Sequence, residues 1–348
     1  MAMRRWVAER KRRACGDVWP IKPDTAAPPP HWPGWPEGKR FAFVLTHDVE
    51  GPDGLDRCRG LAEQEYAHGF RSSYNFIPEG PYVVPPDLRA WLQSQGFEVG
   101  VHDLQHDGHL FSSPQGFELK ARRINDYLRG WEVQGFRSGF MLHNLDWLHQ
   151  LNIQYDCSTF DTDPFEPQPD GVSTIFPFWV PKPPPLPGGA DGQRDPGGGT
   201  RESGVRSQES GRDSNGSSSG TPASSLPPPA SSLLPNPAAT RQGYVELPYT
   251  LAQDSTLFIL LRERTNEIWK QKLAWIAERG GMVLLNTHPD YLDYAERGGP
   301  SVRDQYFDFL EHVKTQYTGA FWHVLPGTLA AYVRHWHHHT VLPRTSLP

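Results

Sequence analysis

The chain has 348 residues, of which 12% are aromatic, and its formal net charge is −6. This supply of bulky apolar side chains, with 12 tryptophans among them, is enough for a core and excludes wholesale disorder. The mild negative charge gives no reason to expect a nucleic-acid partner. The sequence contains no apolar run of about 18 residues, so no membrane span is expected.

Residues 1–40 are expected to form an N-terminal extension. They begin with a basic run between Arg4 and Arg13 and end in the proline-rich stretch AAPPPHWPGWPEGKR, which cannot form regular helix or sheet. We expect the basic run to be a solvated tail rather than a binding patch. The start lacks the apolar stretch of a secretory signal and the three cysteines are scattered, so a cytoplasmic location is expected.

Strand-like and helix-like segments alternate after residue 40. Short apolar runs predict strands, and stretches with helical periodicity predict helices. The expected strands are 41–46, 71–77, 97–102, 134–137, 154–160, 244–249, 282–287 and 321–325. The expected helices are 61–68, 87–95, 117–128, 145–151, 263–279 and one that follows residue 325. Repeated strand–helix units predict an α/β fold with parallel strands, and the size of the patterned part fits a (β/α) barrel.

A low-complexity segment interrupts the domain that we expect over residues 41–340. In residues 181–240, Pro, Gly and Ser supply 12, 10 and 11 of the 60 positions, and no aromatic residue occurs. Such a stretch cannot bury enough apolar surface to offset the entropy lost on ordering. It therefore predicts a disordered insertion within one catalytic domain, and residues 341–348 form a tail.

Polar residues gather where the predicted strands end. In a (β/α) barrel the functional side chains come from the carboxyl ends of the strands, so these positions are candidates for one site. The candidates are Asp48, Glu50, His102, His106, Arg137, Asp156 and His288.

Two histidines, His102 and His106, are spaced so that both rings can reach one metal ion. The i, i+4 spacing places them on one face of a helical turn. Many pairs with this spacing are only surface neighbours, but this pair follows a predicted strand and lies among acidic residues. Asp103 rather than Glu follows His102, so the HExxH motif of zinc proteases is absent.

The first strand leads into Asp48 and Glu50, which are separated by one residue. In an extended chain both carboxylates point to the same side, so one can bind a divalent metal while the other acts as a base. The alternative is that Asp48 caps the following turn. Arg137 emerges from a strand, where a cation needs a counter-ion, and Asp48 is the natural one. His288 suits proton donation near neutral pH, although it could be merely packed.

Five sequence blocks, in order, carry a family resemblance. They are T-H-D-V-E, H-x-x-x-H, F-R-S, Y-D-C-S and L-N-T-H-P, and they lie between about Phe41 and Asp290. Together they resemble the NodB-like polysaccharide deacetylases. The resemblance implies a distorted (β/α) barrel, a mononuclear divalent metal that is often zinc, and a hydrolase of non-peptide C–N bonds. The implied substrate is an N-acetylated sugar, polysaccharide or glycoconjugate.

The resemblance also implies roles for the first two blocks. Val49 stands where the family usually has its metal-binding aspartate, and some relatives carry D-x-E instead. By that pattern Asp48 is the base, and Glu50 binds the metal together with His102 and His106. The alternative is that Asp48 itself binds the metal.

The later blocks complete the implied catalytic set. Arg137 would hold the base, His288 would protonate the leaving amine, and Asp156 would orient or charge-tune His288. Two alternatives remain for the function. One is a catalytically silent barrel that binds glycans through its many Trp and Tyr side chains, and the other is a hydrolase of a non-sugar amide or a cyclic ureide.

Overall fold

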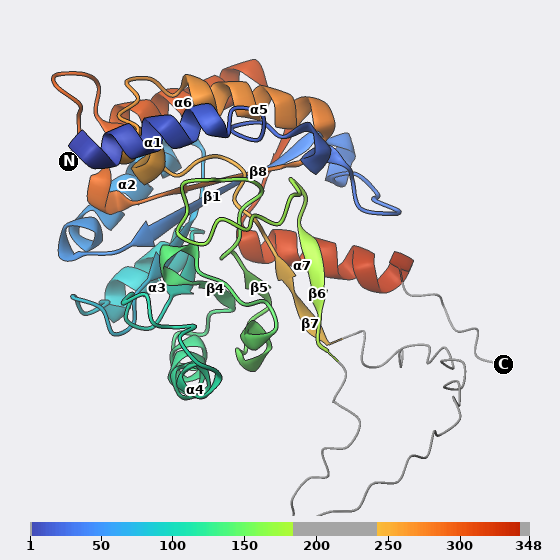
Figure 1. Cartoon of the computed structure of the whole chain (residues 1–348). Coiled ribbons are helices and arrows are strands. Elements are labelled where there is room, and N and C mark those ends of the chain that lie inside the picture. Colours follow the sequence, from blue (N-terminus) through green and yellow to red (C-terminus); the bar gives the residue numbers. More distant parts are fainter. Residues whose placement is uncertain (1, 184–241, 342–348) are drawn as a thin grey trace, which may run out of the picture.

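The computed structural model describes residues 2–183 and 242–341. Within them, nine strands form one curled sheet (Figure 1). The strands are β1 (Phe41–Val49), β2 (Ser73–Phe76), β3 (Glu98–His102), β4 (Gly135–Arg137), β5 (Tyr155–Asp156), β6 (Phe178–Pro181), β7 (Gly243–Glu246), β8 (Met282–Thr287) and β9 (Phe321–His323). Their order is β6-β7-β5-β4-β3-β2-β1-β8, with β9 paired to β1. All these pairs are parallel except β6 with β7.

The strands β1 and β8 form the centre of the core. Every residue of both strands is buried, as expected for apolar parallel strands that are covered on both faces. Their register runs from Ala42 opposite Met282 to His47 opposite Thr287. The polar residues that follow the two strands are therefore neighbours at one edge of the sheet.

The barrel is distorted because its closure depends on single bridges. After β7 the chain forms isolated parallel bridges from Tyr249 to Phe160 and from Leu251 to Leu285. The backbone N–H groups of Thr250 and Leu251 both donate to the carbonyl of Leu284. A short extended segment thus connects the β5 side of the sheet to β8, and the expected distorted α/β barrel is confirmed.

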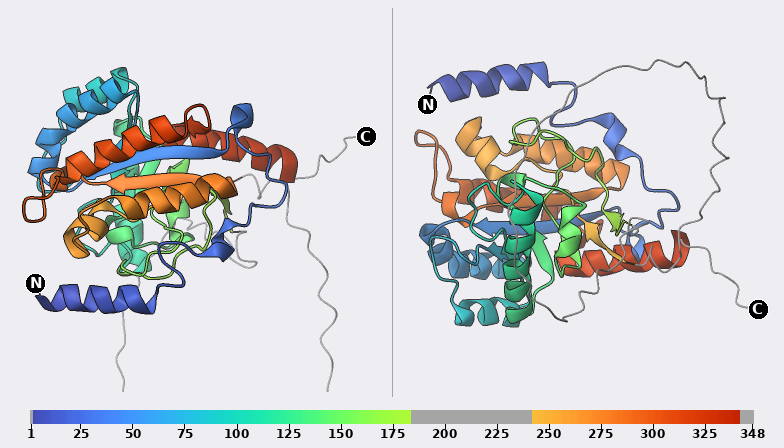
Figure 2. Two further views of the ribbon diagram at one scale, coloured as in Figure 1. Left: turned by 90° about the horizontal axis from the view of Figure 1, so that it is seen from above. Right: turned by 60° about the horizontal axis from the view of Figure 1, so that its bottom comes forward.

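Helices pack around the curled sheet (Figure 2). They are α2 (Pro52–His68), α3 (Pro86–Ser94), α4 (Pro114–Gly130), α5 (Glu267–Arg279), α6 (Val302–Gln316) and α7 (Pro326–Trp336). Helices α3 and α4 contact β3, α5 contacts β1 and β8, and α7 contacts β5, β6 and β7. Of these helices only α6 was not expected. None of the helices described is long and apolar enough to cross a membrane.

The first 40 residues contain a helix and pack against the domain. Helix α1 (Ala2–Ala14) lies at the edge of the molecule (Figure 2), and Arg12 forms an ion pair with Glu263. The ring of Trp32 lies 4.8 Å from that of Trp35 and 5.0 Å from that of Trp336 in α7, measured between centroids. The basic run forms a helix in which Arg10 and Arg13 are exposed and Ala8 is buried, and the aromatic rings that reach the core come from the proline-rich stretch after it.

Most of the predicted insertion, residues 184–240, lies outside the described residues, as does nearly all of the tail from 342 onward. The chain on either side of it is paired. Pro181 in β6 lies opposite Gly243 in β7, and the N–H of Lys182 donates to the carbonyl of Gln242 at 2.8 Å. The segment thus leaves and re-enters the sheet at adjacent points.

Candidate active site and metal centre

The carboxyl ends of β1, β3 and β8 bring three of the predicted residues to one cluster and a fourth beside it. Glu50 follows β1, His102 ends β3, His106 lies four residues later, and His288 follows β8. One ligand atom from each of Glu50, His102 and His106 lies within 4.8 Å of the other two. In the described part of the chain, this is the one such group of metal-binding side chains, and it does not include Asp48.

The ring nitrogens of the two histidines fit a metal ligand set. His102 donates from Nδ1 to the carbonyl of Arg137 at 3.1 Å, which leaves the lone pair on Nε2. The Nε2 atom of His102 is buried and has no hydrogen-bond partner, and the Nε2 atom of His106 lies 3.2 Å from Oε1 of Glu50. Nitrogen donors with one carboxylate are a common zinc set, and the carbonyl contact of His102 is the outer-shell bond that ligating histidines usually make.

The turn between the two histidines differs from the expected helical turn. Asp103 and His106 have φ values of 56° and 55°, in the left-handed region, so the segment folds back instead of continuing as a helix. The Asp103 carboxylate accepts from the N–H groups of Leu104 at 2.6 Å and of Gly139 at 3.1 Å. Asp103 therefore holds the turn and ties it to the loop after β4.

Glu50 is positioned from two sides by residues that follow β8. The Asp290 carboxylate accepts from the backbone N–H of Glu50 at 2.9 Å, and the Tyr291 hydroxyl donates to its carboxylate at 3.0 Å. Burial alone would raise the pKa of Glu50, but the imidazoles of His288 and His106 lower it to about 2. An ionised carboxylate thus faces the Nε2 atoms of both histidines, with Oε1 3.2 Å from that of His106.

Asp48 is buried beside this cluster and is held by three side chains. The Arg137 guanidinium lies 3.3 Å away, and the amide groups of Asn75 and Asn286 donate to the two carboxylate oxygens at 3.0 and 2.8 Å. Although burial favours the protonated form, the charge of Arg137 holds the pKa of Asp48 well below its usual range. The predicted pairing of Arg137 with Asp48 is present, and Asp48 also lines the cavity.

His288 is held by Asp254 rather than by the expected Asp156. Its Nδ1 lies 2.6 Å from one carboxylate oxygen of Asp254, and its backbone N–H donates to the other oxygen at 2.9 Å. Burial would lower the pKa of His288, but the charge of Asp254 raises it to about 10. The ring is therefore cationic at neutral pH, with Nε2 3.7 Å from Glu50.

The pairing predicted between Asp156 and His288 is wrong. Asp156 interacts with Ser158 and with Glu246, and it does not line the cavity. Asp254 was missed because it follows an irregular segment after β7, where spacing gives no sign of its target. Its local signal, a carboxylate that caps the turn at Ser255, indicates structure rather than chemistry.

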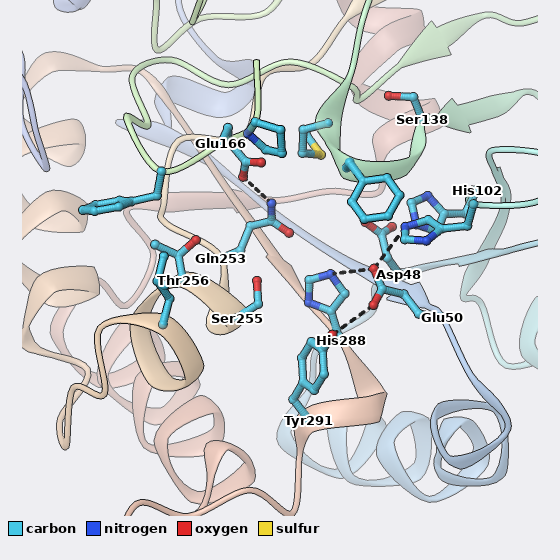
Figure 3. A pocket seen from close by; sticks show the side chains of 16 residues that line it. Asp48, Glu50, His102, Ser138, Glu166, Gln253, Ser255, Thr256, His288 and Tyr291 are labelled. Carbon is cyan, nitrogen blue, oxygen red and sulfur yellow. Dashed lines mark hydrogen bonds and ion pairs between the residues drawn. The ribbon is translucent and has the colours of Figure 1, made fainter. Parts of the chain in front are cut away.

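These residues open into a cavity of about 470 Å³ (Figure 3). Polar groups form part of the wall, and aromatic and aliphatic side chains form the rest. The lining residues are Asp48, Glu50, His102, His106, Ser138, Phe140, Met141, Phe165, Glu166, Pro167, Gln253, Ser255, Thr256, Leu260, His288 and Tyr291. The volume is in the range of small-molecule sites.

Comparison with known proteins gives a match of the fold. No protein-family model matches the sequence, and no curated protein matches it. Among solved structures, the chain is similar to a protein from Mycobacterium smegmatis described as a "putative polysaccharide deacetylase". The TM-score is 0.54 and the identity 14%, over 86% of this chain and 92% of the other.

Two further matches are partial. The family 4 carbohydrate esterase from Streptomyces lividans has a TM-score of 0.30 and 16% identity, over 36% of this chain and 65% of that one. The chitin deacetylase from Colletotrichum lindemuthianum has a TM-score of 0.27 and 14% identity, over 34% of this chain and 56% of that one. The match that spans nearly the whole domain shows that this chain has the fold of the NodB-like polysaccharide deacetylases, which its five sequence blocks resemble.

Proposed function

We propose that the protein is a metal-dependent hydrolase of non-peptide amide C–N bonds that removes the acetyl group from an N-acetylated sugar or glycoconjugate. The observation that carries the proposal is the close grouping of the Nε2 atoms of His102 and His106 with the Glu50 carboxylate, in which the buried Nε2 of His102 has no hydrogen-bond partner. The match to a polysaccharide deacetylase fold supports the same reaction class.

A divalent ion, with zinc the best fit to two imidazoles and a carboxylate, would be held by Glu50, His102 and His106. Such an ion lowers the pKa of a bound water and polarises a carbonyl. The outer contacts of these three ligands, to the Arg137 carbonyl and to Asp290 and Tyr291, would keep them oriented.

The proton transfers would be divided between Asp48 and His288. Asp48 is ionised and faces the cavity, so it can accept the proton of the attacking water, and Arg137 fixes its position. His288 is held in its cationic form by Asp254, so it carries a proton on Nε2 in addition to the Nδ1 proton that Asp254 binds, and it can donate the Nε2 proton to the departing amine nitrogen. Asp48 is thus ionised and can act as the base, while His288 is protonated and can act as the acid, as amide hydrolysis requires.

The first experiment compares His102→Ala with His109→Ala, a matched control three residues beyond His106 whose side chain is exposed. Both variants and the parent are loaded with zinc, dialysed and assayed for metal content and for acetate released from N-acetylglucosamine and its oligomers. We expect His102→Ala to lose tight zinc binding and turnover, and His109→Ala to keep both. Full zinc stoichiometry and turnover in His102→Ala would refute the metal site.

A further inference from the structure

Glu166 lines the cavity but has no part in the proposed reaction. It belongs to the loop between β5 and β6, is 8% exposed, and lies beside Gln253 in Figure 3, away from His102. Its Oε1 atom accepts from the Gln253 amide and from the Tyr249 hydroxyl, both at 2.6 Å. Its Oε2 atom makes no hydrogen bond to any described residue.

The orientation of Gln253 follows from a chain of donors that begins at Arg137. Arg137 can only donate, and it does so to the side-chain oxygen of Asn286. The Asn286 nitrogen must then face Asp48 and the side-chain oxygen of Gln253, at 2.8 and 3.0 Å. Gln253 is therefore left with its nitrogen toward Glu166, so Oε1 of Glu166 accepts this hydrogen bond.

A proton count at Tyr249 identifies which of two neighbouring acids is ionised. The hydroxyl of Tyr249 lies 2.6 Å from Glu166 and 3.0 Å from Oδ2 of Asp163, yet a phenol has one proton to donate. Oε1 of Glu166 already accepts from the Gln253 amide, so we assign the Tyr249 proton to the contact with Glu166 and the shared proton of the acid pair to Asp163, which then donates to Tyr249. Burial and the charge of Glu166 raise the pKa of Asp163 to about 7. Burial also raises the pKa of Glu166, but the hydrogen bonds from Tyr249 and Gln253 oppose that shift, which favours Glu166 as the ionised member of the pair.

The charged side chains of the cavity determine which substrate groups can bind near Glu166. The cavity also contains the carboxylates of Asp48 and Glu50 and the cationic ring of His288, and no lysine or arginine occurs among its described lining residues. The cationic groups of the cavity, which are His288 and the proposed divalent ion, lie beside Glu50, so an anionic group placed near Glu166 would meet a carboxylate there. A hydroxyl or ammonium group would meet an acceptor with a vacant oxygen.

We propose that Glu166 is the substrate-recognition carboxylate of this cavity and that its Oε2 accepts a hydrogen bond from a substrate hydroxyl or ammonium group. The cavity therefore takes uncharged or cationic N-acyl amines, such as the amides of amino sugars, and rejects those that carry a carboxylate or phosphate. This inference rests on the proposed function and narrows its substrate class.

The test measures binding as well as turnover. The zinc-loaded parent protein, Glu166→Gln and Asp163→Asn are titrated in a calorimeter with N-acetylglucosamine, glucosamine and N-acetylmuramic acid. N-acetylmuramic acid is N-acetylglucosamine with a lactyl carboxylate added. Asp163→Asn is the matched control, because it removes the other acid of the pair, which does not line the cavity.

We expect the parent to bind N-acetylmuramic acid at least about tenfold more weakly than N-acetylglucosamine. We expect Glu166→Gln to weaken glucosamine binding by about tenfold, which is the effect of losing a hydrogen bond to a charged group. Asp163→Asn should bind all three probes as the parent does. Equal binding of the anionic and neutral probes by the parent, no binding of any probe, or equal losses in both variants would overturn the proposal.

Acetate release in the same preparations separates this inference from the proposed function. If the parent releases no acetate but Glu166→Gln alone loses glucosamine binding, deacetylation is refuted and the role of Glu166 stands. If the parent releases acetate and Glu166→Gln matches it in KM and in all three affinities, deacetylation stands and the role of Glu166 is refuted.

Discussion

At the scale of single residues, the proposed proton donation by His288 depends on the acid that contacts its ring. The sequence predicts that this histidine directly follows a buried strand, and in the structure it follows β8. The sequence pointed to Asp156, which ends a strand, and gave no sign that Asp254 is the partner. Only the folded chain separates them, since the contact with Asp254 joins residues 34 positions apart.

Replacing Asp254 with Asn should lower kcat and leave the metal content unchanged. The neutral amide no longer stabilises the cationic ring, so His288 loses its proton-donating form, and we expect a loss of roughly 100-fold, within the range of general acid catalysis. Steady-state kinetics with zinc analysis provides the measurement.

Asp156→Asn is the control for this prediction, because it also removes a buried acid that ends a strand. It should keep kcat close to that of the parent, since Asp156 contacts Ser158 and Glu246 and not His288. An equal loss of kcat in the two variants would contradict the role of Asp254.

The turn between His102 and His106 packs closely against residue 139, so this position requires glycine. A Cβ atom at this position would lie 2.6 Å from the Asp103 carboxylate and 2.8 Å from the His106 ring. We therefore expect Gly139→Ala to displace His106 and to weaken zinc binding by about tenfold or more, as second-shell changes do. Gly130→Ala, at the end of α4, meets no atom within 4 Å and serves as the control. A competitive chelator titration measures both, and unchanged zinc affinity in Gly139→Ala would exclude this packing role.

At the scale of elements, the long apolar strands were predicted more closely than the shortest strand and helix α6. The range 282–287 matches β8, and the range 41–46 falls within β1, because continuous apolar runs suit strands covered on both faces. The range 154–160 forms only the two-residue β5, since the residues beyond it turn their hydrogen bonds to side chains such as Glu246. Helix α6 was missed although its capping box, Ser301 with Asp304, is a sequence signal.

The N-terminal segment should contribute to stability through its tryptophans. Trp35 is 6% exposed, and its Nε1 donates to the carbonyl of Gly280 at 2.7 Å. Trp35→Ala should lower the free energy of unfolding by about 3 kcal/mol, the usual cost of a large cavity. Trp6, which is 61% exposed, is the control, and Trp6→Ala should change it by less than about 0.5 kcal/mol. Urea unfolding followed by circular dichroism gives both values, and equal effects would show that residue 35 is not part of the core.

At the scale of the whole molecule, the buried acid Asp163 makes stability depend on pH. Its pKa is raised from 3.8 to about 7, so the folded chain binds a proton that the unfolded chain releases. The contribution is complete below the unfolded value and is lost as pH rises toward about 7. Relative to Asp163→Asn, the parent should therefore lose on the order of 2 kcal/mol of stability between pH 5 and pH 8.

Denaturant unfolding of both proteins in the presence of a chelator measures this difference without contributions from metal binding. Asn has the same shape as Asp but does not titrate, so the contributions of the acids that both proteins share cancel in the comparison. A difference between parent and variant that stays constant with pH would show that Asp163 is not protonated in the folded state.

The predicted insertion can be tested through its described ends. Because Pro181 and Gly243 are paired across β6 and β7, a short turn can replace residues 184–241 without moving either strand. We expect the shortened chain to keep its zinc stoichiometry and to gain up to about 2 kcal/mol from the smaller loop-closure entropy. Thermal unfolding and zinc analysis check this, and a loss of the folded state would show that the segment belongs to the domain.

The amino-acid sequence alone determined the α/β class and most strand positions, and it predicted the candidate metal ligands with Glu50 and Asp48 as alternatives for the carboxylate. Apolar runs and polar strand ends are local features, and parallel strands bring their carboxyl ends to one rim whatever the connections. The tertiary structure decided which acid holds His288, how His106 turns back toward His102, that the first 40 residues pack on the core, and that Glu166 faces the cavity. Each of these depends on contacts between residues that are distant along the chain or on backbone angles that no residue spacing specifies.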